Sequence, residues 1–407
     1  MGKLTNLVSV PTLVESPFII AHIGNYTFGS YTAKKFGKGV KVTYPNFMEG
    51  MEVTKVNGTV NTYVLNFVYQ VAESDDPNFM DKIFSSAAIT RRIVLEYGDW
   101  NSPAYIYKKE ECIMTNVTSS LDMNTSCIKY KVQCTSDSVG LTSTGYNFPG
   151  REAKPSDVLK EMLRSSKYGL RKVFSGMLNN IDALIASNDK PVMLLPQQNI
   201  TPLQYMNYLV TSMQSYKSSG SSVIGNSIYM LTIHDDRTNN YSGSYFKVTE
   251  VSPNTKVYSN PDTYEIDVNF PGDNMVTQFS LNNDQAWTIL YQFSDELKQE
   301  EYTYQYDDKG SLVSTYSPSI ARSDNGWLSA AKSSWWTKVT QFPIQATITI
   351  KGLTRPSILM SYVKVNVWFA GGKKHNSSGL YIITKQVDSL NAQGYKTTLT
   401  LLRVGGD

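Results

Sequence analysis

Histidine is scarce in this sequence, which holds only His22, His234 and His375 in 407 residues. A hydrolytic triad or a metal site generally needs a histidine close to a nucleophile or a carboxylate. The best candidate is the run HDD at 234–236, but it follows SIYMLTI and precedes RTNN. A strand that ends in a solvated turn explains this pattern better than a ligand cluster, because short motif matches are often fortuitous. We therefore expect no catalytic residue, no metal and no cofactor, and predict that the protein is not an enzyme.

Cysteine and charge are limited as well. Cys112, Cys127 and Cys134 are odd in number and lack zinc-type spacing, so neither a disulfide framework nor a metal site is expected. Charged residues make up 18% of the chain and the net charge is +3, without the clustered basic stripe of a nucleic-acid binder. The lysines at 33–35 and 38–41 form short, interrupted runs, which we interpret as solvated loop residues.

Long apolar runs and phosphate-binding loops are also missing. No apolar run approaches the roughly 18 residues of a membrane helix, and the first residues lack the patterns of a signal peptide or a myristoylation site. The segment GNYTFGSY at 24–31 lacks the lysine of a phosphate loop, so Gly24 and Gly29 are expected in a hairpin or a bulge. We expect a soluble protein made in a reducing cytoplasm, without membrane insertion.

Tyrosine is abundant, with 27 copies, and it occurs beside many threonines, serines and asparagines, a mixture that suits half-buried strands. In TYVLNFVYQV at 62–71 the larger apolar residues occupy every second position. The same period occurs in RRIVLEY (91–97), TYEIDVNF (263–270), IQATITI (344–350) and YVKVNVWF (362–369). Such alternation predicts strands with one face in a core and the other toward water or a partner. Residues 78–88 are predicted to form a short helix between strands.

The pattern becomes helical between about residues 151 and 250. Pro155 stands near a predicted helix start, followed by an apolar stripe made of Val158, Leu159, Met162 and Leu163. A second apolar series, also of helical spacing, runs from 170 to 185. Segment 201–217 carries a capping box, with Thr201 as N-cap, Pro202 in the first helical position and Gln204 reaching back.

The order of these patterns predicts an α+β fold that is predominantly antiparallel β, in three domains. We place a first β domain at 1–150, a helical α+β domain at 151–254 and a second β domain at 255–407. Within the last, the acidic segment 294–310 is interpreted as a solvated hairpin turning at 308–310. An acidic docking surface and a glycosidase-like carboxylate set are the alternative interpretations of that segment.

Two features of the second β domain point toward partners. Trp335 and Trp336 are adjacent, and neighbouring strand residues face opposite sides, so one can contact a partner or a sugar. A tryptophan that packs back on its own domain is an equal alternative. The last residues, 377–407, form two β-rich runs around a turn. Because chain ends are usually loose unless tied down, we expect this hairpin to close a sheet within a larger assembly.

Four stretches carry a resemblance to a known family: 77–100, 148–170, 199–213 and 378–403. Taken in order, they resemble the baseplate hub proteins of contractile-tailed phages and their relatives in tailocins and type VI secretion spikes. The last stretch resembles the family's terminal hairpin, in which the pattern Y-x-T-x-L-x-L-x-R falls on Tyr395, Thr397, Leu399, Leu401 and Arg403. The histidine that many relatives carry in the first strand of that hairpin is missing from TKQVDS.

The resemblance implies two tube-like β-barrel domains that flank the helical domain, and a homotrimer in which six such domains surround a DNA passage channel. This ring would adapt a six-fold tail tube to a three-fold central spike. The implied partners are the tail tube protein and the central spike protein, followed by tape-measure and baseplate wedge proteins. DNA would pass without sequence readout. The location implied is the virion tail baseplate, assembled in the host cytoplasm.

The expected partner-interface residues are Trp335, Trp336, Tyr395, Leu399 and Arg403. A different function, a tail-associated carbohydrate- or receptor-binding protein, would instead use the tryptophan pair. A cell-wall hydrolase within a tail protein is the third hypothesis, and it lacks a plausible catalytic set in this sequence.

Overall fold

The structure is a computed structural model, and it describes the chain in separate ranges. These ranges are 17–30, 34–37, 40–43, 47–72, 75–87, 92–99, 107–122, 124–180, 185, 189, 191–213, 228–234, 244–251, 264–269, 276–282, 303–306, 312–315, 345–352 and 359–405. The predictions for Asp235, Asp236, the turn at 308–310 and the tryptophan pair Trp335 and Trp336 lie outside the described residues.

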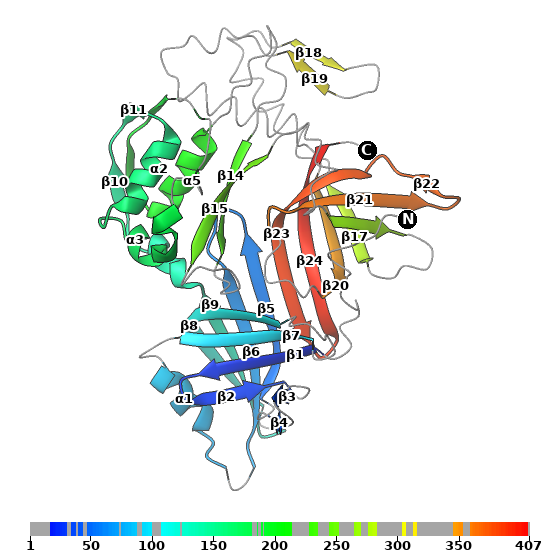
Figure 1. The fold of residues 1–407 in the computed structure, drawn as a ribbon. Coiled ribbons are helices and arrows are strands. Elements are labelled where there is room, and N and C mark those ends of the chain that lie inside the picture. The colour runs from blue at the N-terminus through cyan, green and yellow to red at the C-terminus, as the bar shows by residue number, and fades with distance from the viewer. Residues whose placement is uncertain are drawn as a thin grey trace.

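The first β body is an antiparallel sheet with the strand order β5-β6-β9-β8-β7-β1-β2 (Figure 1). Helix α1 (Phe79–Ala87) belongs to this body, and the separate hairpin of β3 (Lys34–Gly37) and β4 (Val40–Thr43) lies beside it. The strands of the sheet are β1 (Pro17–Ile23), β2 (Tyr26–Gly29), β5 (Met48–Val56), β6 (Thr62–Gln70), β7 (Arg92–Asp99), β8 (Tyr107–Asp122) and β9 (Cys127–Thr135).

The predicted alternation builds the core of this body. On β6, Tyr63, Leu65 and Phe67 are buried, while the residues between them are partly exposed. Helix α1 covers the same core, and its Phe84 ring lies 5.6 Å from Phe67 and 5.3 Å from Tyr130 on β9. The short helix predicted at 78–88 is therefore confirmed as α1, whose apolar residues pack on the face that the strands leave apolar.

The second β body contains the remaining strands of the same 14-stranded sheet, in the order β17-β20-β24-β23, with β21 beside β23 and β16 beside β21. The bounds are β16 (Tyr264–Val268), β17 (Val276–Asn282), β20 (Gln345–Lys351), β21 (Tyr362–Phe369), β22 (Lys373–Lys374), β23 (Gly379–Asn391) and β24 (Gly394–Gly405). One pairing differs from the antiparallel expectation, because β16 and β21 run parallel. Period-two alternation is the same for both directions, so the sequence pattern could not distinguish them.

In sequence, the helical region separates the two β bodies. Helix α2 (Pro155–Arg164) has proline in its first turn and buries the predicted stripe. Helix α5 (Pro202–Ser212) begins with the predicted capping box: Thr201 Oγ1 accepts from Gln204 N at 3.3 Å, and Gln204 Oε1 accepts from Thr201 N at 2.8 Å. Short elements connect the helices: η1 (Asp137–Thr142), β10 (Tyr146–Phe148), β11 (Arg151–Ala153), β12 (Val192–Leu194) and β13 (Gln197–Ile200).

Within the described residues 170–180, the predicted apolar series forms less regular helix than its spacing predicts. These residues contain the single turn α3 (Leu170–Val173) and the 3-10 helix η2 (Ser175–Asn180). Gly176 lies at the start of η2, and glycine costs a helix interior about 1 kcal/mol relative to alanine. The apolar residues Leu170, Phe174 and Met177 are nevertheless buried, so packing is retained although the regular helix is lost.

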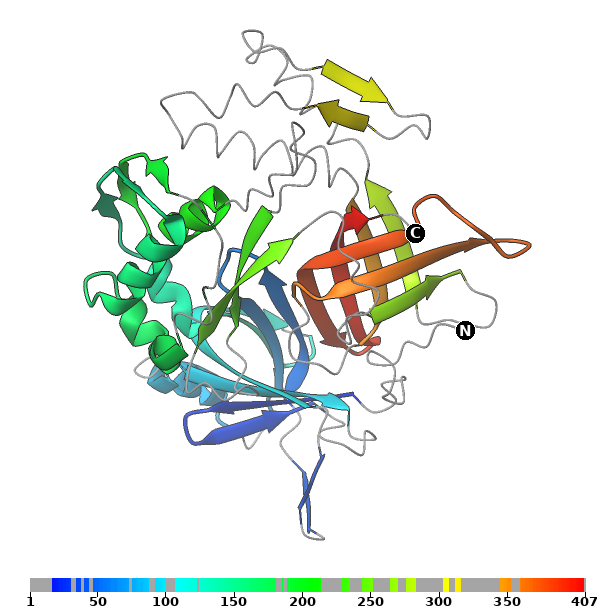
Figure 2. The same ribbon diagram turned by 45° about the horizontal axis from the view of Figure 1, so that its top comes forward.

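The hairpin of β14 (Ile228–His234) and β15 (Tyr245–Val251) lies between the helical region and the second β body (Figure 2). Alternate residues divide between its two faces. Leu231 and Ile233 pack in the cluster that holds the helices, whereas Met230 and Val251 pack against Leu380 and other residues of the terminal strands. A further described pair is β18 (Thr303–Tyr306) with β19 (Leu312–Thr315).

Among the described residues, no helix is both long and apolar enough to cross a membrane.

Candidate functional site

The terminal hairpin, β23 with β24, belongs to both β bodies (Figure 1). The first part of β23 pairs with β21 of the second body, from Tyr362 opposite Ile382 to Val365 opposite Gly379. Its later part pairs with β5 of the first body, where 385–390 lie opposite 51–56. A register shift between Ile383 and Lys385 marks the change from one partner to the other, as bulges often do. The hairpin therefore joins the two bodies into one sheet.

The turn end of this hairpin is packed into the first body. Leu390 and Tyr395 are buried members of the first core, although they come from the last strands of the chain. Gly50 on β5 approaches the Leu390 carbonyl so closely that a Cβ there would lie 2.8 Å from its oxygen. Gly352 likewise lies against the Tyr395 ring, and its N–H donates to the Tyr395 carbonyl at 2.9 Å. A larger residue at either position would clash with these atoms, so glycine is needed for the close contact of Gly50 with the Leu390 carbonyl and of Gly352 with the Tyr395 ring.

A buried ion pair lies on the first-body side of this contact. The Lys55 Nζ is 2.5 Å from Glu110 Oε1, and both side chains are almost completely buried. The Tyr63 hydroxyl donates to Glu110 Oε2 at 2.7 Å, and the Tyr97 hydroxyl donates to Glu110 Oε1 at 2.9 Å. Strands β5, β6, β7 and β8 each contribute one of these residues, so a charged group deep in the sheet is fully hydrogen-bonded, as burial requires.

A second buried carboxylate comes from the hairpin itself. Asp388 accepts from Thr397 Oγ1 at 2.7 Å and from Gln386 Nε2 at 3.0 Å, and all three side chains are inaccessible to solvent. Burial, followed by the nearby Asp388 charge, raises the pKa of the Tyr395 hydroxyl well above its ordinary value. Tyrosine at this position therefore stays neutral and can act as a donor.

Two tyrosines link the surroundings of the buried carboxylates: Tyr97 is hydrogen-bonded to Glu110, and Tyr395 lies near Asp388. The Tyr97 and Tyr395 rings are 6.4 Å apart and nearly perpendicular. Burial raises the pKa of Tyr97 strongly, and the charges of Glu110 and Asp388 add to the effect. We call the whole set the junction network; its members are Lys55, Tyr63, Tyr97, Glu110, Gln386, Asp388, Tyr395 and Thr397. Because these groups are sealed from solvent, the network can fix the register of β23 on β5 but offers no access for a substrate.

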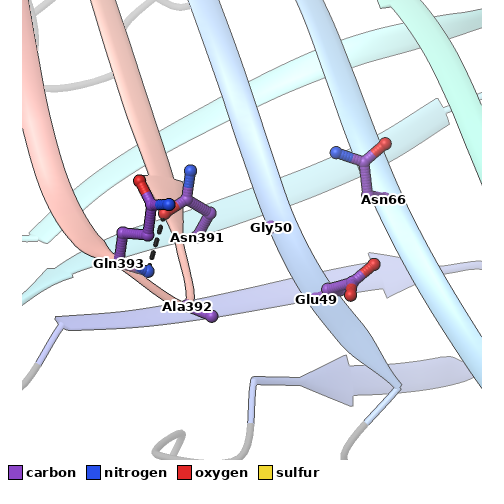
Figure 3. Close-up of a pocket in the computed structure, with 6 residues that line it drawn as sticks. All are labelled: Glu49, Gly50, Asn66, Asn391, Ala392 and Gln393. Carbon is purple, nitrogen blue, oxygen red and sulfur yellow. Dashed lines mark hydrogen bonds between the residues drawn. The ribbon is translucent and has the colours of Figure 1, made fainter.

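A small open pocket lies outside this junction (Figure 3). The hairpin turn, with Asn391, Ala392 and Gln393, lies beside Glu49 and Gly50 of β5, and Asn66 of β6 completes the lining. The pocket encloses about 240 Å³. The turn is held by a hydrogen bond in which Gln393 N donates to Asn391 Oδ1 at 2.8 Å. The lining residues include the single carboxylate of Glu49, and they form no constellation for acid–base chemistry.

The histidines and cysteines lie in separate places. His22 is beside Glu96, His234 stacks on Tyr245 at 4.7 Å, and His375 contacts Ser377 at 2.6 Å. No disulfide joins the three cysteines. Among the described residues, no group of three histidine, cysteine or acidic side chains could hold a metal ion.

The sequence-predicted interface residues fall into different environments. Tyr395 and Leu399 are both buried, the first in the core of the first body and the second in that of the second body. Arg403 is half-buried, and its Nη2 donates to the Ser378 carbonyl at 3.0 Å. Trp335 and Trp336 lie outside the described residues. The roles of all five residues at a partner interface stay predictions.

The junction network itself was missed from sequence. Lys55 continues the apolar positions Met51 and Val53 of β5, and Asp388 lies on the same face of β23 as Leu390. A charged residue in an apolar register is a usable signal, because it must find a buried partner. Glu110, however, is 55 residues from Lys55, and the pairing of β5 with β23 joins residues more than 300 positions apart, so no local pattern identifies the network.

Comparison with known proteins gives a likeness in fold. No family model and no curated protein sequence matches this chain. Among solved structures, a 43 kDa tail protein of prophage MuSo2 from Shewanella oneidensis is similar over 96% of this chain and 97% of its own, with 10% identity and a TM-score of 0.48. A tail protein from Neisseria meningitidis MC58 gives 95% and 97% coverage, 10% identity and 0.47.

A third similar structure is a component of the type VI secretion system of E. coli, described as similar to the T4 phage tail proteins gp27 and gp5. It is similar over 89% of this chain and 75% of its own, with 9% identity and a TM-score of 0.45. The structural neighbours are thus phage tail and type VI secretion proteins, the group that the sequence resemblance named. Every TM-score here is below 0.5, so the likeness alone assigns no function to this chain.

Proposed function

We propose that this protein is a structural baseplate hub of a phage-like tail. Three copies form a ring that adapts a six-fold tail tube to a three-fold central spike. The observation that carries the proposal is that one chain holds two β bodies joined into one 14-stranded sheet by its terminal hairpin. Three such chains present six β bodies, which is the number that a six-fold tube requires.

The junction supports this role because an adapter ring needs a fixed angle between its two bodies. A flexible linker would let the bodies rotate, whereas continuous pairing from β21 through β23 to β5 restricts them. The buried Lys55–Glu110 pair and the Asp388 hydrogen bonds favour one register of that pairing. Head-to-tail contacts between rigid units can then close into a ring, which leaves no exposed interaction surface at either end.

The proposed partners follow from this position in the tail. The tail tube protein would contact one side of the ring and the central spike protein the other, with tape-measure and baseplate wedge proteins as further contacts.

The proposed location is the virion tail baseplate, which is assembled in the host cytoplasm. Within each chain, two tube-like domains at 1–150 and 255–407 would flank the helical domain at 151–254. DNA would pass through the channel without sequence readout. The net charge of +3 favours this, because a strongly basic lining would retain a polyanion.

Mass in solution tests the proposal. Light scattering on the purified protein, with negative-stain images of the same fractions, should give a three-fold ring near three times 45.6 kDa. Spike protein added to these fractions should bind at one trimer per ring, and tube protein should stack on the opposite side. A protein that stays monomeric at every concentration, alone and with either partner, contradicts the hub function.

A further inference from the structure

Strand β8 is more than twice as long as its pairing with β7. Its first half, 107–113, lies opposite 92–98 of β7. Its second half, 116–122, lies opposite 127–133 of β9, and no described strand pairs with its other side. A register shift between Met114 and Asn116 separates the halves. Residues 116–122 therefore present one row of backbone donors and acceptors that the described part of the sheet does not use.

This edge lacks the usual protection. Exposed edge strands normally carry lysine, proline or an inward charge, which prevent pairing with other chains. The second half of β8 reads NVTSSLD, with no proline, no lysine and one charge at its end. Leu121 is 59% exposed, the largest exposed fraction among the large apolar side chains of the described residues. An unprotected edge with an exposed leucine suits strand addition by a partner.

The two faces of this edge differ in chemistry. Val117 and Leu121 lie opposite Val132 and Ile128 on the face covered by helix α1. On the other face, Thr118 and Ser120 lie opposite Lys131 and Lys129, which are exposed. One side of an added strand would therefore extend an apolar core, and the other side would lie near two positive charges.

We propose that residues 116–122 bind an extended strand of a partner protein, with apolar side chains on one face and acidic side chains on the other. Neighbouring strands lie about 4.8 Å apart, so the added strand would be roughly 10 Å from β9. The short side chains of Thr118 and Ser120 leave room for the lysine stems of β9 to cross β8 and reach carboxylates. Backbone pairing supplies affinity and the two faces supply selectivity. The inference stands without the proposed hub function.

A synthetic peptide of alternating valine and glutamate, labelled with a fluorophore, is the direct probe. Its anisotropy on titration with the full chain should show saturable binding, and hydrogen exchange should show new protection of amides in 116–122. A peptide with lysine in place of each glutamate should bind at least tenfold more weakly. A peptide with a central proline should also lose binding, because proline removes a ladder donor.

Two variants test the edge and its charge separately. Ser119→Lys with Leu121→Lys adds edge lysines to exposed positions on the apolar face and should weaken the glutamate peptide at least tenfold, because the peptide's valines would then pack against charges. Lys129→Glu with Lys131→Glu should reverse the preference toward the lysine peptide. Ser143→Lys, at an exposed position after η1, is the matched control and should leave binding unchanged. Urea midpoints close to that of the natural protein show that each variant is folded.

Three results would overturn the proposal. If the glutamate and lysine peptides bind equally well, the partner strand need not be acidic. If the new amide protection falls outside 116–122, the peptide does not bind at this edge. Concentration-dependent self-association that the edge-lysine variant abolishes would assign the edge to a second copy of this chain instead.

Discussion

At the scale of single residues, the Lys55–Glu110 pair carries the largest expected energy. Glu110→Gln keeps the shape but only one of the two acceptor oxygens that the tyrosines use, and it leaves the buried Lys55 charge without its counter-charge. Removing one partner of a buried pair typically costs about 3–5 kcal/mol. We expect the free energy of unfolding, measured in urea, to fall by roughly that amount.

Two companion variants separate burial from charge in this prediction. Lys55→Met combined with Glu110→Gln removes the unpaired charge and should recover part of the lost stability. Asp76→Asn breaks the exposed pair with Lys82, whose atoms are 2.6 Å apart, and should leave the urea midpoint almost unchanged. A loss as small in Glu110→Gln as in Asp76→Asn would contradict the importance of the buried pair.

Glu96 makes stability depend on acid pH. The His22 ring at 3.7 Å, together with Lys109 at 3.2 Å, holds the pKa of Glu96 at about 2, below its ordinary value of 4.5. A depressed pKa in the folded protein adds stability above pH 4.5, and this contribution is lost as the pH falls toward 2. Urea midpoints between pH 5 and pH 2 should therefore fall more steeply for the natural protein than for Glu96→Gln. Parallel curves would exclude this role.

The capping box of α5 gives a residue-scale prediction that was already visible in sequence. Thr201→Ala removes the acceptor of the Gln204 N–H and should lower the free energy of unfolding by about 1 kcal/mol. Thr201→Ser keeps the hydroxyl and serves as the control in the same urea measurement. Equal losses in both variants would mean that the methyl group, not the cap, matters.

At the scale of elements, the terminal hairpin should exchange its amide hydrogens together with β5, because they pair and share a core. Leu390→Asp places a charge in that core and should speed exchange in both 51–56 and 385–390. Exchange in α5, which packs in a different cluster, should stay unchanged. Leu121→Asp is the control, because that leucine is 59% exposed. Faster exchange confined to β23 would show that β5 does not depend on the hairpin.

Elements with local signals could be predicted from the sequence, and those that depend on distant contacts could not. The alternation at 62–71 and the proline-led start of α2 are local, and both are confirmed. The parallel pairing of β16 with β21 and the pairing of β23 with β5 join residues about 100 and more than 300 positions apart. A strand's pattern shows that it needs a neighbour but not which one. The junction network was missed for the same reason.

At the scale of the whole molecule, the terminal hairpin should couple the unfolding of the two β bodies. Its residues enter the cores of both bodies, and a further cluster ties it to β14–β15. Neither body can release the hairpin without exposing apolar surface and the buried carboxylates of the other. We therefore expect calorimetry to show one shared transition for the two β bodies of the natural protein.

Lys55→Glu should separate that shared transition into two. The change brings a third carboxylate beside buried Glu110 and near Asp388, and like charges in a buried site repel strongly. The pairing of β23 with β5 should open, so that the first body melts at a lower temperature than the second. Hydrogen exchange at Val53 and Ile348 assigns each transition to its body. Lys129→Glu makes the same charge change at an exposed position and should keep one transition. Two separate transitions in the natural protein would mean that the hairpin does not couple the bodies, and the rigid adapter would lose its physical basis.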